Sequence, residues 1–137
     1  MSTIRELQTR VGEINAMNGW RSTDERTLDP KARVNAQITR LALITTEVAE
    51  AIEELRNGRA VDEAYYSKSN VSPFDEREAT NPDGSLRKPE GVPSELADVV
   101  VRALDAAGAW GIDLQEAIEQ KLAYNALRGY RHGGKAV

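Results

Sequence analysis

The sequence contains no cysteine and a single histidine, His132, among its 137 residues. Disulfide bonds, thiolate metal sites and metal sites with several histidine ligands are therefore excluded. Long hydrophobic runs are also missing, since the longest stretch of consecutive apolar residues is about four, whereas a membrane-spanning helix needs about 20. The first ten residues, MSTIRELQTR, lack the apolar core of a signal peptide. We expect a soluble, cytoplasmic protein that makes no contact with a membrane.

An excess of positive charge is absent as well. The chain carries 18 Lys and Arg against 22 Asp and Glu, for a formal net charge of −4. A protein that binds a nucleic-acid polymer through its whole surface has the opposite balance. The length suits one domain, so we predict a single domain over residues 1–137.

Start and stop signals for helices recur along the chain. Thr3 and Glu6 can form a capping box, and Asp29 followed by Pro30 is typical of a helix N-terminus. From Pro30 a helical pattern of about 27 residues runs to Asn57-Gly58, and its length predicts a kink or a break. Two further helices are expected, one capped by Ser94 and one that starts at Asp113 and runs to about Arg128.

The predicted fold is all-α: a helical bundle of four to five helices, with a long loop between the second and third main helices. This loop covers about 58–93, and turn residues dominate its second half. A short hairpin or helix near 61–66 fits its composition. The last segment, about 129–137, is glycine-rich and basic.

The predicted helix 94–108 combines an apolar surface with a strip of charge. Glu95, Asp98, Arg102 and Asp105 recur every three or four residues, and nearly all other positions are Leu, Val or Ala. A helix that is apolar over so much of its circumference is expected to be buried. The strip therefore faces either a thin line of solvent or a polar cavity.

The helix before the long loop carries a matching group of acids, Glu47, Glu50 and Glu54, on one face. If the two helices are neighbours, four carboxylates can converge: Glu47, Glu50, Glu95 and Asp98. Uncompensated, they would repel one another, and a hard cation relieves that repulsion. Oxygen ligands alone suit Mg²⁺ or Mn²⁺. The alternative is a solvated acidic face. A di-iron centre is disfavoured because the Glu-x-x-His pairs of such bundles are missing.

The last helix and the tail supply positive charge. Lys121, Asn125 and Arg128 share one side of the helix, with Tyr124 beside them, and the tail adds HGGK with Lys135. Cations near a helix C-terminus have an ordinary explanation in the helix dipole. The glycines before Lys135 also allow backbone N–H groups to close on an anion. Acids that hold a metal, facing such a basic segment, would form a polyphosphate site.

The segments EVAE (47–50), ELAD (95–98) and KLAYNALR…HGGK (121–135) resemble the MazG-like nucleoside triphosphate pyrophosphohydrolases. The resemblance implies an all-α fold, usually dimeric or higher, in which E-x-x-E and E-x-x-D bind Mg²⁺. It implies hydrolysis of a (deoxy)nucleoside triphosphate to the monophosphate and pyrophosphate, as in nucleotide-pool house-cleaning. The chain departs from many relatives in having Thr46 where a second acid would precede Glu47, and in the long separation of Glu50 from Glu95.

The same resemblance implies roles for individual residues. The metal ligands would be Glu47, Glu50, Glu95 and Asp98. The residues expected to contact the nucleotide or its phosphates are Lys121, Tyr124, Asn125, Arg128 and Lys135.

Several assignments stay open at this point. Glu50 or Glu54 would activate the attacking water, and the sequence does not choose between them. Trp20, with Asn15 and Asn18, can contact a base, although Trp20 suits a hydrophobic core equally well. The rival function is a non-catalytic helical module that binds nucleotides or another protein, with the acidic strip as a partner surface.

Overall fold

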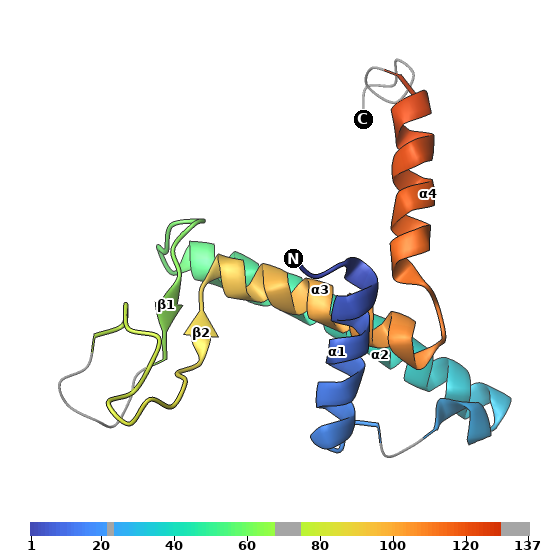
Figure 1. Cartoon of the computed structure of the whole chain (residues 1–137), viewed down its shortest axis with the longest axis horizontal. Helices are drawn as coiled ribbons and strands as arrows, with labels where there is room; N and C mark the ends of the chain where they lie inside the picture. Colours follow the sequence, from blue (N-terminus) through green and yellow to red (C-terminus); the bar gives the residue numbers. More distant parts are fainter. Residues whose placement is uncertain (22–23, 68–74, 130–137) are drawn as a thin grey trace. The chain divides into compact units, whose positions relative to one another are not determined.

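The protein is mostly helical in a computed structural model that describes residues 1–21, 24–67 and 75–129 (Figure 1). The all-α prediction is confirmed, with four α-helices and a small two-stranded sheet. The elements in order are α1 (Ile4–Met17), a 3₁₀ helix η1 (Glu25–Thr27), α2 (Pro30–Arg56), β1 (Tyr65–Tyr66), β2 (Pro89–Glu90), α3 (Val92–Ala109) and α4 (Leu114–Leu127). None of the helices in the described ranges combines the length and apolar character needed to cross a membrane.

Local capping chemistry sets most of the helix ends. The Thr3 side chain accepts from the backbone N–H of Glu6, and the Glu6 carboxylate accepts from the N–H of Thr3, which is the predicted capping box. Asp29 accepts from the N–H of Ala32 at 3.0 Å, with Pro30 in the first turn of α2. The helix then runs unbroken for 27 residues. The expected break is wrong, because no glycine or proline interrupts the segment after Pro30.

The start of α3 differs from its prediction. The helix begins at Val92 rather than after Ser94, and the N–H of Glu95 donates to the Gly91 carbonyl at 3.1 Å. The Ser94 hydroxyl donates to the Pro89 carbonyl, so it does not cap the helix. Pro93 is tolerated here because a first-turn residue has no helical acceptor for its N–H. Its presence inside the helix is what displaced the predicted start.

The long connection between α2 and α3 contains ordered structure. Strands β1 and β2 pair antiparallel, with Tyr65 opposite Glu90 and Tyr66 opposite Pro89. An isolated bridge joins Thr80 to Leu86. The buried Arg87 donates from Nη1 to the carbonyl of Asp75 and from Nε to the side chain of Asn81. The short hairpin or helix expected within residues 61–66 is not formed, because only Tyr65 and Tyr66 are in a strand and their partner strand comes from residues 89–90. The pair of β1 and β2 is called the hairpin below.

The chain divides into two compact units. The first unit comprises Met1–Asp24 and Leu104–Val137, and the second comprises Glu25–Ala103. The prediction of a single domain stays a prediction. In the first unit the buried apolar residues are Leu104, Ala106 and Ala107, and in the second they are Ala51 and Val92.

Polar contacts to α1 organise the first unit. Arg5 pairs with Asp113 at 2.8 Å, which lowers the pKa of the Asp113 carboxyl. Asp105 pairs with Arg21 at 2.7 Å and accepts from the Asn15 amide at 2.8 Å. Asp105 is therefore a structural ion-pair partner. This agrees with its place outside the set of predicted metal ligands, although it shares the strip of Glu95 and Asp98.

Gly91 is the glycine whose replacement is expected to disturb the hairpin most. Its φ is +99°, and a Cβ added there would lie 2.3 Å from the Glu63 carbonyl oxygen. Gly91→Ala should lower the free energy of unfolding by about 2 kcal/mol or more, since a left-handed alanine alone costs roughly 1–2 kcal/mol. Gly84→Ala is the control, because Gly84 has φ +84° with nothing within 4 Å of an added Cβ. Equal losses in urea denaturation would contradict the close approach to Glu63.

Candidate metal centre

Three carboxylates from two helices meet in the second unit. Oxygen atoms of Glu47 and Glu50 on α2 and of Glu95 on α3 all lie within 4.8 Å of one another. The residues Glu47 and Glu95 are each only 5% exposed, whereas Glu50 is exposed. The group therefore has a buried inner side and an open outer side. Such an arrangement offers several hard oxygen donors to one cation.

The sequence places these acids together through simple helix geometry. A spacing of three puts Glu47 and Glu50 on one face of α2. Glu95 lies in the first turn of α3, where the helix dipole favours a negative charge. Helix α2 and residues 92–103 of α3 lie side by side within the second unit (Figure 1). An ion pair from Arg102 to Glu47 joins them.

Charge compensation within this group is incomplete. Among the described residues no N–H or O–H group donates to the Glu95 carboxylate, and the group that faces it is the carboxylate of Glu50. Burial, followed by a hydrogen bond with the Glu50 carboxylate and by the nearby charges of Glu50, Asp98 and Glu47, raises the pKa of Glu95 to about 7. Near neutral pH a proton or a cation is therefore needed beside Glu95. Arg102 pairs with Glu47, and the Lys88 ammonium, whose pKa is raised chiefly by Glu90 and also by Glu95 and Glu50, supplies further positive charge.

The fourth predicted ligand, Asp98, lies one turn after Glu95 and is not part of this group. Asp98 is an exposed residue. Burial of the carboxyl and the charge of Glu47 raise the pKa of Asp98, while Arg102 and Lys88 act in the opposite direction. Asp98 is thus close enough to interact with the centre electrostatically. The structure brings together three of the four predicted ligands.

A second group of three carboxylates shares Glu95 with the first. It consists of Glu54 from α2, Glu90 from β2 and Glu95, again with oxygens within 4.8 Å of one another. The Ser67 hydroxyl donates to Glu90 at 2.5 Å, and Lys88 pairs with Glu90 at 3.5 Å. Glu54, predicted as a candidate for activating water, belongs to this second group. Glu90 was missed, because its position depends on strand pairing and no local motif marks it.

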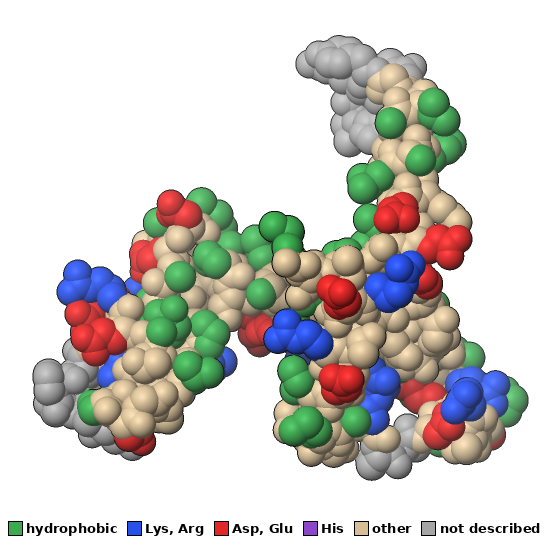
Figure 2. All heavy atoms as spheres, viewed as in Figure 1, with side chains coloured by type: hydrophobic (Ala, Val, Ile, Leu, Met, Phe, Trp, Pro, Cys, Tyr) green, Lys and Arg blue, Asp and Glu red, His purple; other side chains and the backbone are tan. Residues whose placement is uncertain are grey.

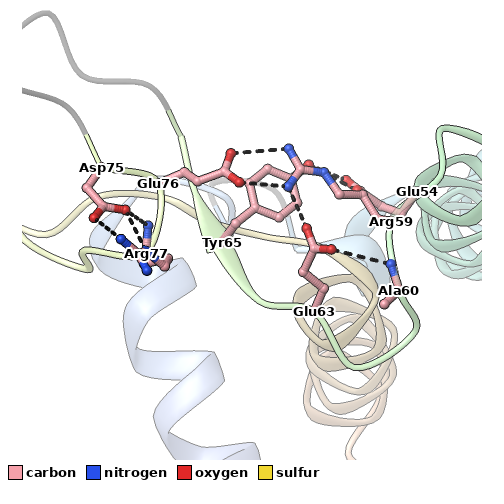
Figure 3. Close-up of polar contacts among 8 residues, drawn as sticks. All are labelled: Glu54, Arg59, Ala60, Glu63, Tyr65, Asp75, Glu76 and Arg77. Atoms are coloured by element: carbon pink, nitrogen blue, oxygen red, sulfur yellow. Dashed lines mark hydrogen bonds and ion pairs between the residues drawn. The ribbon is translucent and has the colours of Figure 1, made fainter.

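A small polar network fixes the orientation of Glu54 (Figure 3). The Tyr65 hydroxyl donates to both carboxylate oxygens of Glu54, at 3.0 Å each. Burial and the Glu54 carboxylate raise the pKa of Tyr65, so the phenol keeps the proton that it donates. The Arg59 guanidinium lies 3.7 Å from the centre of the Tyr65 ring and pairs with Glu63 and Glu76. The hairpin thus supports one acid of the candidate centre.

The predicted nucleotide-contacting residues belong to the first unit. On α4, Tyr124 is 59% exposed. Arg128 lies 5.8 Å from its ring centre, and its guanidinium donates weakly to the Asn125 side chain at 3.5 Å. Lys121 is exposed on the same helix, and Lys135 lies outside the described residues. Trp20 is 76% exposed, so it is not part of a hydrophobic core in the single chain.

Asn15 and Asn18, which were predicted to contact a base together with Trp20, make other contacts in the structure. The Asn15 amide is bound to Asp105, and Asn18 forms the C-terminal cap of α1 through its backbone.

Comparisons with protein-family models, with curated proteins and with solved structures found no match for this chain. The resemblance to the MazG-like enzymes therefore stays a prediction.

Proposed function

We propose that this protein hydrolyses a (deoxy)nucleoside triphosphate to the (deoxy)nucleoside monophosphate and pyrophosphate in a Mg²⁺-dependent reaction. The observation that carries the proposal is the buried Glu95 carboxylate, which faces other carboxylates and receives no donor from the described residues. A buried acid in this situation favours a bound cation. The E-x-x-E and E-x-x-D motifs, followed by the K-x-x-Y-N element on α4, direct the proposal to nucleoside triphosphates.

The donor set fits Mg²⁺, with Mn²⁺ as a second choice, because every candidate ligand is a carboxylate oxygen. Glu47, Glu50 and Glu95 would hold the metal, and Asp98 would join them after a change of side-chain conformation. When bound, the ion would polarise the substrate phosphates and neutralise charge that develops in the transition state.

The chain's own residues would supply the remaining steps. Glu50 or Glu54 accepts a proton from the attacking water. The water oxygen forms a bond to the α-phosphorus as the bond to the oxygen bridging to the β-phosphorus breaks. The pyrophosphate leaves with that bridging oxygen. We assign Lys121, Arg128 and Lys135 to the phosphates, and Tyr124, Asn125 and Trp20 to the nucleoside. The proposal includes a cytoplasmic protein that acts as a homodimer or homotetramer.

The reaction itself is tested by product analysis over a panel of standard and damaged (deoxy)nucleoside triphosphates. With Mg²⁺ present, we expect monophosphate and pyrophosphate from at least one member, and no turnover after chelation of the metal. Release of orthophosphate alone from every substrate would contradict the proposed position of attack. The measurement separates the two cleavage positions because pyrophosphate and orthophosphate are detected independently.

One observation favours a second candidate function. Large apolar side chains of α3 are open to solvent in the single chain, with Leu96 at 56% and Val100 at 49% exposed. Such surfaces are typical of proteins that bind other proteins. A non-catalytic module that binds nucleotides or a protein partner is therefore the alternative. Mg²⁺-dependent nucleotide binding without pyrophosphate release would support it.

A further inference from the structure

Tyr65 connects the hairpin to the acidic side of α2. Its hydroxyl donates to both carboxylate oxygens of Glu54, at 3.0 Å each (Figure 3). Both residues are half-buried. A carboxylate that accepts through both oxygens from one hydroxyl has a fixed direction, because rotating it lengthens one of the two bonds. The hairpin therefore determines how Glu54 is oriented.

The face of the Tyr65 ring is covered by Arg59. The guanidinium lies 3.7 Å from the ring centre, and it donates to Glu63 and, at 3.0 Å, to Glu76. Figure 2 shows Lys and Arg side chains beside Asp and Glu side chains on the surface around the hairpin. Since Arg59 is paired with two acids and stacked on the ring, it restrains the position of the Tyr65 hydroxyl.

The hairpin also places Glu54 beside the candidate metal centre. Tyr65 lies opposite Glu90, so the two side chains are neighbours on one face of the strand pair. Oxygens of Glu54, Glu90 and Glu95 lie within 4.8 Å of one another, and Glu95 follows Glu90 by five residues, in the first turn of α3. Glu54 is therefore next to a proposed metal ligand but outside the three-residue group that would hold the metal.

Glu50 and Glu54 differ in their freedom to accept a proton. Glu50 belongs to the group that would hold the metal, and a carboxylate bound to a cation accepts a proton poorly, because the cation stabilises the charged form. Glu54 lies outside that group, and Tyr65 fixes its orientation.

We infer that Glu54, positioned by the Tyr65 hydroxyl, accepts the proton of the attacking water. The inference rests on the proposed function and selects one of the two acids that it leaves open. The proton moves to a Glu54 oxygen as the water oxygen bonds to the α-phosphorus, and pyrophosphate leaves with the electron pair of the broken bond. Tyr65 is a positioning residue, because it acts on the reaction only through Glu54.

Tyr65→Phe in the full chain tests this inference, because it removes the hydroxyl and keeps the ring on Arg59. We expect kcat to fall by about tenfold, since misplacement of a catalytic group by about 1 Å costs up to about 100-fold. KM, and the Mg²⁺ affinity measured by calorimetry without nucleotide, should change by less than about threefold. Tyr66→Phe is the matched control. It removes the same atom on the opposite face of the strand, so kcat should stay level.

A double variant shows whether the hydroxyl acts through Glu54. Glu54→Gln should lower kcat by about 100-fold or more, and adding Tyr65→Phe to it should cause no further loss. A further tenfold loss, by the same measure of coupling, would overturn the inference. So would a loss of Mg²⁺ affinity of about tenfold or more in Glu54→Gln without nucleotide, because Glu54 would then be a metal ligand.

Glu54→Asp keeps the test valid if Tyr65→Phe fails to fold. It retains the carboxylate but withdraws it from the Tyr65 hydroxyl, so kcat should fall by about tenfold, whereas Glu53→Asp on the exposed neighbour should leave it level. Equal kcat values within either matched pair, in a chain that is otherwise active, overturn this inference alone. An unmodified chain that turns over no triphosphate contradicts the proposed function, and this inference with it.

Discussion

Glu95→Gln is expected to lower Mg²⁺-dependent turnover by about 100-fold or more. Glu95 is the acid common to both carboxylate groups, and it is 5% exposed. Glutamine keeps the shape of the side chain but removes the anionic oxygen that a hard cation requires. Loss even of an outer partner of a metal ligand typically costs 10- to 100-fold in affinity or activity, so loss of a ligand should cost at least as much.

Glu53→Gln is the matched control for this substitution. Glu53 lies on α2 beside Glu54, its side chain is 60% exposed, and its partner is Arg56 at 3.9 Å. It belongs to neither carboxylate group, so turnover should change little. Turnover and Mg²⁺ affinity are measured for both variants. Equal and small effects would mean that Glu95 belongs to a solvated acidic face, and the proposed reaction would lose its main support.

Helix ends were predictable where the chemistry that sets them is local. Thr3 with Glu6 and Asp29 with Pro30 act over three residues or fewer, so the sequence contains the whole interaction. The start of α3 was misplaced by three residues because Pro93 fits both the end of a loop and the first turn of a helix. The backbone at Gly91 decides between these two positions for Pro93. Gly91 has a φ of +99°, and the hairpin ends there, immediately before Val92.

Only some of the residues that form the two carboxylate groups could be predicted from the sequence. The helical spacing identified Glu47, Glu50 and Glu95, because each lies on a helix face that the sequence displays. Glu90 depends on its pairing with Tyr65 across a long insertion, which no local pattern encodes. Asp105 shared the strip of Glu95, but its partners Asn15 and Arg21 lie more than 80 residues away in sequence.

The apolar surface of α3 illustrates a different limit. Its composition predicted a buried helix, yet Leu96 and Val100 are about half exposed in the single chain. A hydrophobic pattern indicates that a face needs cover, and it does not say which chain provides that cover.

The metal-free protein should lose stability as the pH rises from about 5 to 8. The pKa of Glu95 is raised from 4.5 to about 7, chiefly by burial, and the pKa of Asp98 is raised as well. The folded state therefore holds more protons than the unfolded state over this window, so the free energy of unfolding falls with pH. Asp75, with its pKa lowered to about 2, acts in the opposite direction but below about pH 4.

Mg²⁺ should reverse this loss, with an effect that grows with pH. Below pH 7 a proton competes with the metal for Glu95, so the apparent Mg²⁺ affinity should rise by up to about tenfold per pH unit and level off above pH 7. Binding to the folded state alone raises the thermal midpoint, so Mg²⁺ should stabilise the protein more at pH 8 than at pH 5.5. Thermal midpoints between pH 5 and 8, with chelator or with Mg²⁺, measure both effects.

Glu95→Gln separates the titration of this carboxyl from other sources of pH dependence. An amide does not titrate, so most of the decline in the metal-free midpoint between pH 5 and 8 should disappear, leaving the part due to Asp98. The midpoint of the variant at pH 8 without metal should exceed that of the unmodified chain, because repulsion from Glu50 and Glu47 is relieved. Glu53→Gln should retain the decline. A Mg²⁺ effect independent of pH, or a decline unchanged in Glu95→Gln, would show that the proton and the metal do not share this carboxylate.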